Sequence, residues 1–131
     1  MKRLLLFLVL LFSIAGISGS DLHAANPKGE KKVSVIYFYG KQRCPTCRAI
    51  EQVAKEAVKE INNKNVTLKL VDISDKNNAS LVNKYKVSWS SLFVVSGKSK
   101  KDLTDEGFRN AQSNPKKFKT LLITEINDLL K

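Results

Sequence analysis

The segment from residue 33 to residue 61 limits the fold of this chain more than any other. Residues 33–39 are a nearly continuous run of β-branched and aromatic side chains, which is typical of a strand buried on both faces of a sheet. After a short loop, apolar residues recur at steps of three and four, which predicts an amphipathic helix with charged residues such as Glu51 on its other faces. The apolar stripe consists of Cys47, Ile50, Val53, Ala54, Ala57, Val58 and Ile61.

The rest of the chain continues to alternate between strand-like and helix-like patterns. The expected elements are a strand over 66–73, a short helix over 78–85, a buried strand over 92–95, an edge strand over 101–104 and a helix from residue 114 onward. Asn114 suits the cap of this last helix and Pro115 its first position. Strands that alternate with helices predict an α/β fold, in which helices cover both faces of one sheet.

The composition is that of one soluble globular domain. The chain has 131 residues, of which 43% are hydrophobic and 27% charged, and its net charge is +11. These values exclude a disordered chain and leave no room for a second domain of ordinary size. The Lys-rich stretch 98–101 is expected to be a solvated turn, so we expect no nucleic-acid binding. We expect a monomer.

The first residues are typical of a secretory signal peptide. Residues 1–3 include two basic side chains, and residues 4–17 are apolar apart from Ser13 and Gly16. Fourteen helical residues span about 21 Å, which is short of a bilayer core of about 30 Å. We therefore predict a signal peptide over 1–24, with cleavage after Ser20 or after Ala24.

The predicted signal peptide sets the expected location and the domain bounds. A leader over 25–32 and a domain over 33–131 would follow it. Export places the mature chain in an oxidising compartment, and a bacterial periplasm is the expected one. An uncleaved anchor is the alternative, and apart from this segment no contact with a membrane is expected.

The only cysteines are Cys44 and Cys47, separated by Pro45 and Thr46. A disulfide that closes so small a loop stabilises a fold by at most about 2 kcal/mol, so a structural role in stabilising the fold explains this pair poorly. A structural zinc site needs four ligands, and the only histidine, His23, lies in the predicted signal peptide. Thiol–disulfide exchange and the capture of a thiophilic ligand by two sulfurs therefore remain as explanations.

The position of the pair between a strand and a helix has chemical consequences. Free N–H groups and the helix dipole at a helix N-terminus stabilise a thiolate, so the pKa of Cys44 should fall. The neighbouring cations of Arg43, Arg48 and Lys41 act in the same direction. We expect Cys44 to be the exposed nucleophile, and Cys47, on the apolar stripe, to be the buried resolving thiol.

These features resemble the thioredoxin-like superfamily over residues 33–131. The resemblance rests on the first strand, on Cys44-Pro45-Thr46-Cys47 with the helix after it, and on residues 85–87 leading into the strand over 92–95. It implies a central mixed sheet flanked by helices and a dithiol that works as a thiol–disulfide oxidoreductase without a bound cofactor. It also implies protein dithiol or disulfide partners, with a membrane protein as a further electron donor.

The loop expected to face the dithiol departs from the superfamily pattern. Thioredoxins usually place a cis-proline just before the third strand, where this chain has Ser91 after Trp89 and Ser90. They also often bury an acid six residues before the first cysteine, a position held here by Phe38. The serine hydroxyls are able to donate hydrogen bonds across the dithiol. Trp89 is expected to pack in the core or at the rim of the site.

A narrower resemblance concerns residues 39–51 and 89–95. These segments are similar to small exported thioredoxin-like proteins that are labelled as a nitrophenyl compound nitroreductase subunit and resemble proteins found near arsenical efflux permeases. The sequence contains no flavin-binding pattern. The resemblance implies, as an alternative to exchange, that Cys44 and Cys47 bind an organoarsenical or a soft metal ion such as copper(I). The third alternative is that the domain is a non-catalytic interaction module.

Overall fold

A four-stranded sheet forms the centre of the fold. The computed structural model describes residues 30–131. The strands lie in the order β2-β1-β3-β4, with β1 and β2 parallel and the other neighbours antiparallel. Their bounds are Val33–Tyr39 for β1, Val66–Asp72 for β2, Ser91–Ser96 for β3 and Ser99–Asp102 for β4. The sheet is therefore mixed, and β1 is one of its two central strands.

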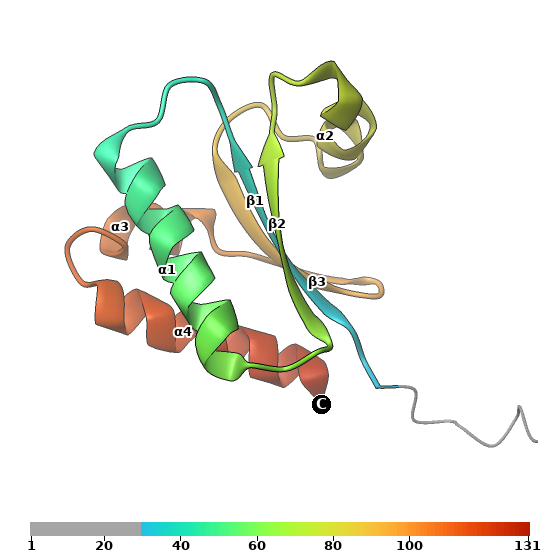
Figure 1. Cartoon of the computed structure of the whole chain (residues 1–131), viewed down its shortest axis with the longest axis vertical. Helices are drawn as coiled ribbons and strands as arrows, with labels where there is room; N and C mark the ends of the chain where they lie inside the picture. Colours follow the sequence, from blue (N-terminus) through green and yellow to red (C-terminus); the bar gives the residue numbers. More distant parts are fainter. Residues whose placement is uncertain (1–29) are drawn as a thin grey trace, which may run out of the picture.

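Helices cover both faces of this sheet (Figure 1). Three of them lie on one face: α1 (Pro45–Ile61), α3 (Thr104–Asn110) and α4 (Pro115–Leu130). The other face carries α2 (Ala79–Tyr85), which follows a short 3-10 helix, η2 (Lys76–Asn78). The α/β fold expected from the sequence is confirmed.

The alternation of side chains along β1 builds two separate cores. Val35 and Tyr37 point into the cluster formed with α1 and α4, whereas Ile36 and Phe38 point into the cluster formed with α2. All four residues are almost completely buried. A core on each face favours apolar side chains on both, which explains a strand sequence that is apolar apart from Ser34.

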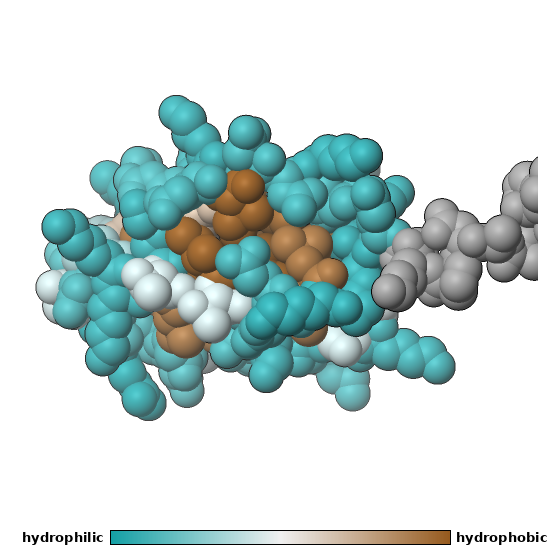
Figure 2. Space-filling model, turned by 90° about the horizontal axis from the view of Figure 1, so that it is seen from below, coloured by the Kyte–Doolittle hydropathy of each residue, from teal (hydrophilic) through white to brown (hydrophobic). Residues whose placement is uncertain are grey.

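The side of the molecule on which α4 lies carries an apolar area that is visible at the surface (Figure 2). Figure 2 looks at the molecule from below, the side on which α4 lies in Figure 1. An apolar area lies in the middle of this side and is enclosed by hydrophilic side chains. Partly buried residues at the ends of α1 and α4 pack against the larger core, among them Ile61 and Leu129.

The structure corrects the expected ending of the sheet. The edge strand expected over 101–104 lies at Ser99–Asp102, and α3 follows it where no helix was predicted. The Asp102 carboxylate accepts a hydrogen bond from the backbone N–H of Thr104 (3.0 Å), which turns the chain into α3. Gly107 disfavours a helix by its backbone entropy. A Cβ atom there would lie 3.2 Å from the side chains of Ile50 and Phe118, which would have to shift by a few tenths of an ångström, so the close packing favours glycine.

The second strand is also less buried than its alternating sequence suggests. Leu68 is half-buried and Leu70 is 40% exposed, because β2 lies at the edge of the sheet. The predicted signal peptide over 1–24 lies outside the described residues, and of the leader only 30–32 are described, all of them exposed. Between residue 30 and residue 131, no helix is long and apolar enough to cross a membrane.

Candidate active site

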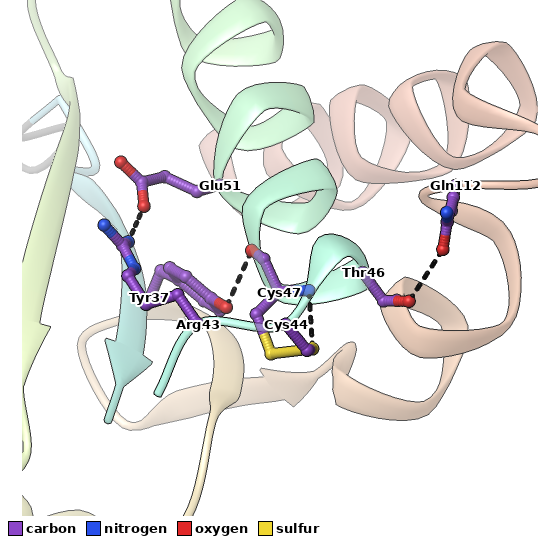
Figure 3. Close-up of a disulfide and its surroundings, with 7 residues drawn as sticks. All are labelled: Tyr37, Arg43, Cys44, Thr46, Cys47, Glu51 and Gln112. Carbon is purple, nitrogen blue, oxygen red and sulfur yellow. Dashed lines mark hydrogen bonds and ion pairs between the residues drawn. A yellow bond between two sulfur atoms is a disulfide. The ribbon is translucent and has the colours of Figure 1, made fainter. Parts of the chain in front are cut away.

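Cys44 and Cys47 form a disulfide at the N-terminus of α1 (Figure 3). Their Cα atoms are 5.1 Å apart. Cys44 has an extended backbone and is the cap residue of the helix, and Pro45 is the first helical residue. Proline suits this position because its ring fixes φ near the helical value and its missing N–H would have no partner there.

The two sulfur atoms lie in different environments. Cys44 is exposed, whereas Cys47 is 6% exposed and faces the core. The sulfur of Cys44 accepts a hydrogen bond from the backbone N–H of Cys47 (3.1 Å). The first turn of α1 carries no acidic residue. The Cys44 sulfur thus sits where backbone N–H groups and the helix dipole stabilise a negative charge.

A buried tyrosine lies against the second cysteine. The hydroxyl of Tyr37 donates a hydrogen bond to the backbone carbonyl of Cys47 (2.9 Å), and the tyrosine is fully buried. Burial raises the pKa of Tyr37, although a hydrogen bond with the Ser90 side chain and the positive charge of Arg43 act in the opposite direction. Tyr37 is therefore a neutral hydrogen-bond donor that links the first turn of α1 to the facing loop.

Phe38, the residue six positions before Cys44, lies on the face of the sheet opposite α1. Phe38 points to the α2 face of the sheet, where its ring lies 5.7 Å from that of Tyr85 and 5.8 Å from that of Phe93. Tyr37, on the other face, is the β1 side chain that reaches Cys47. Phe38, six residues before Cys44, therefore does not face the disulfide, because successive residues of a strand point to opposite faces of the sheet.

Arg43 lies between the end of β1 and α1. Its guanidinium lies over the ring of Tyr39, 4.2 Å from the centroid, and forms an ion pair with Glu51. Glu51 also pairs with Lys55 (2.6 Å). The sequence placed Glu51 on a solvent-facing side of the helix, but its side chain is only 12% exposed. Arg48, the other arginine beside the cysteines, is exposed.

Thr46, between the two cysteines, anchors the motif to a distant part of the chain. Its hydroxyl donates a hydrogen bond to the side-chain oxygen of Gln112 (2.9 Å), in the connection between α3 and α4. Figure 3 shows this contact on the opposite side of the disulfide from Arg43. Gln112 lacked any signal in the sequence, because the contact joins residues far apart in the chain.

The predicted facing loop lies beside the end of β1. Ser91 begins β3 opposite Phe38, is 5% exposed, and donates its hydroxyl to the Trp89 carbonyl (3.1 Å). Trp89 is 60% exposed and stacks on Phe108, with ring centroids 5.8 Å apart, so it does not pack in the core. Residues 30–131 contain no cis peptide bond, so the backbone before Ser91 is trans.

A shallow cavity of about 280 Å³ opens next to Trp89, and its lining includes Ser91 and the carboxylates of Asp102, Asp105 and Glu106. In the part of the chain from residue 30 onward, no group of three or more His, Cys, Asp or Glu side chains could hold a metal ion. Capture of a soft ligand at this site would therefore depend on the sulfur atoms of Cys44 and Cys47 alone.

The fold and the cysteine pair together define a class of protein. A mixed sheet flanked by helices, with Cys-x-x-Cys at the start of the helix that follows a central strand, is the arrangement of thioredoxin-like thiol–disulfide oxidoreductases. Proteins of this class act on protein dithiol and disulfide partners. The resemblance to the superfamily and the prediction of an oxidoreductase are thereby confirmed.

The family within this class is also clear. The model of the Glutaredoxin-like domain (DUF836) matches residues 35–115, more than half of the chain, and the chain belongs to this family. The match begins within β1 and ends at the start of α4, so it includes the disulfide and the facing loop. No curated protein matches the chain.

The solved structures that match the chain include two thioredoxins and a thioredoxin-like protein. Chloroplastic thioredoxin z has 16% sequence identity and a TM-score of 0.53, and the match covers 86% of this chain and 90% of that one. Thioredoxin-2 of the malaria parasite has 22% identity and a TM-score of 0.49, covering 75% and 84%. A thioredoxin-like protein from Clostridium perfringens has 17% identity and a TM-score of 0.48, covering 90% and 91%. At 16% identity, the likeness to thioredoxin z shows the fold alone.

Proposed function

We propose that this chain is an exported thiol–disulfide oxidoreductase in which Cys44 attacks and Cys47 resolves. The observation that carries the proposal is the difference in exposure: the Cys44 residue is open to a partner at the helix N-terminus, whereas Cys47 is buried below it. Only an accessible sulfur can form a bond with a protein partner, so the mixed disulfide forms at Cys44.

The exchange reaction follows from this order. A partner thiolate attacks the Cys44 sulfur, the bond between the two cysteines breaks, and Cys47 leaves as a thiolate. A second partner thiolate then attacks the partner's sulfur in the mixed disulfide and releases Cys44 as a thiolate. The partner becomes a disulfide and this chain a dithiol, with two electrons transferred. The reverse sequence, in which Cys47 attacks the mixed disulfide, reduces a partner.

The surrounding residues have supporting roles in this proposal. Pro45 begins the helix that stabilises the Cys44 thiolate, and Thr46 holds the motif through Gln112. Arg43 contributes a positive charge from the loop before Cys44, with its guanidinium held by Glu51, and Arg48 contributes one from the exposed face of α1. Electrons are exchanged with partner dithiols or a membrane donor, and the chain works as a monomer.

The proposal also assigns the chain to a narrower group of proteins. We place the chain with the small exported thioredoxin-like proteins labelled as a nitrophenyl compound nitroreductase subunit, on the similarity of residues 39–51 and 89–95. The activity that we propose for this chain as a member of that group is disulfide exchange at Cys44 and Cys47, which form a disulfide in the structure.

The reduction potential of the pair tests the proposed chemistry. We expect a value above that of thioredoxin, about −270 mV, because a stabilised Cys44 thiolate favours the reduced form. The measurement is equilibration with glutathione followed by alkylation of the free thiols. A value at or below about −270 mV would contradict the stabilised thiolate and indicate a reductant. A pair that does not exchange at all would overturn the function and favour ligand capture by the two sulfurs.

Export is tested separately in a bacterial host. The full-length chain should appear in the periplasmic fraction in a shortened form that lacks the signal peptide. Leu8→Arg places a charge in the apolar run and should leave an unshortened chain in the cytoplasm. Leu70→Arg, on the exposed edge strand, is the control and should be exported. An unshortened wild-type chain in the membrane fraction would instead show the uncleaved anchor.

A further inference from the structure

Glu51 is the one acidic side chain that α1 buries. A buried carboxylate costs free energy unless it is paired with opposite charge. Both of its oxygens are paired here, one with the Arg43 guanidinium and the other with the Lys55 amine (2.6 Å). The helix therefore holds a charge one turn beyond Cys47, and the pairing with Arg43 directs it toward the loop before Cys44.

Arg43 connects this carboxylate to the reacting cysteine. It directly precedes Cys44, and its guanidinium is held between the ring of Tyr39 and the Glu51 carboxylate. Figure 3 shows the Arg43 side chain extending away from the disulfide toward Glu51. The ion pair thus ties the residue before the nucleophile to the helix that carries both cysteines.

The same pair controls the charge near the disulfide. A cation beside a cysteine stabilises its thiolate, and a carboxylate paired with that cation offsets the effect. The other charged groups around this loop are Lys41, Arg48 and Asp72. Hydrogen bonds from Ser74 lower the pKa of Asp72, and the charges of Lys41 and Arg43 add to this, so Asp72 is ionised as well. Arg43 therefore acts on Cys44 with part of its charge offset.

We propose that Glu51 is a positioning residue for the exchange reaction. It holds the Arg43 guanidinium, offsets its charge at Cys44, and thereby sets how readily the disulfide is reduced. This inference rests on the proposed function, since it takes Cys44 as the attacking cysteine. Loss of the Glu51 carboxylate leaves more of the positive charge of Arg43 without an opposite charge, which stabilises the Cys44 thiolate and favours the dithiol over the disulfide.

Glu51→Gln removes the charge and keeps the shape of the side chain. We expect the glutathione equilibrium to shift about three- to tenfold toward the dithiol, with a matching fall in the pKa of Cys44 measured by alkylation at different pH values. Arg43→Gln should shift both quantities in the opposite direction. The control is Glu56→Gln, five residues further along the same helix at an exposed position, which should leave both unchanged.

Combining Glu51→Gln with Arg43→Gln shows whether the effect passes through Arg43. We expect Glu51→Gln to have a smaller effect when Arg43 is absent. An unchanged equilibrium in Glu51→Gln, a shift toward the disulfide, or an undiminished effect without Arg43 would overturn the inference. If Glu51→Gln does not fold, the direction in which Arg43→Gln shifts the glutathione equilibrium is the remaining test. A shift toward the dithiol, or no shift, would then overturn the inference. Absence of exchange in the wild type would instead refute the proposed function itself.

Discussion

Cys44→Ser is expected to abolish the reduction of insulin disulfides, and Cys47→Ser to accumulate mixed disulfides with its partners. Cys44 is exposed at the helix N-terminus, so a partner meets this sulfur first, and a serine hydroxyl there is not a nucleophile at neutral pH. Without the Cys47 thiol, a mixed disulfide formed at Cys44 is not resolved from within the chain. Insulin turbidity measures the activity, and non-reducing electrophoresis measures the trapped species.

The comparison between the two serine variants decides the order of attack. Both variants lack the disulfide, so the reduced wild-type chain is the control for folding, checked by far-UV circular dichroism. Equal trapping by Cys44→Ser and Cys47→Ser would show that both sulfurs are accessible and would contradict the order assigned from burial. Trapping by Cys44→Ser alone would reverse that order.

The elements that the sequence predicts well are those with strong local patterns. The ends of β1 agree with the predicted strand over 33–39, because β-branched and aromatic residues fill both of its faces. The helix of the apolar stripe, α1, buries Cys47 and Ile50 as its period indicates. The last helix begins at Pro115, where Asn114 accepts a hydrogen bond from a backbone N–H three residues on. Each of these signals lies within a few residues of the structure it determines.

The parts that the sequence does not predict depend on contacts between distant residues. Gly107 predicts no helix from its own propensity, and its close packing against Ile50 and Phe118 in α3 joins residues far apart in the chain. Glu51 reads as a partner of Lys55 on a solvated surface, since nothing local reveals that the loop brings Arg43 back to it.

The candidate site shows the same division. The cysteine pair and its position between a strand and a helix are visible in the sequence, because the motif is local. The roles of Tyr37 and Gln112 are not, because each reaches the motif from another element. Finding Tyr37 requires knowing which face of β1 meets α1, and a strand that is apolar on both faces does not reveal this in its sequence.

Leu122→Ala is expected to lower the free energy of unfolding by about 2–5 kcal/mol. Leu122 is fully buried in the core between the sheet, α1 and α4, so alanine would leave a cavity that the surrounding side chains cannot close. Because domains of this size are stable by only about 5–15 kcal/mol, this one change removes a large share of the total. Urea unfolding followed by far-UV circular dichroism measures the loss.

Leu70→Ala is the matched control, since it removes the same atoms from the edge strand β2. Leu70 is 40% exposed, so we expect a loss of less than about 1 kcal/mol. The difference between the two variants isolates the contribution of burial, because the chemical change is identical. Equal losses would contradict the placement of α4 against the sheet and α1. Equal losses would also contradict the packing by which α4 holds α1, and the disulfide at its N-terminus, against the end of β1.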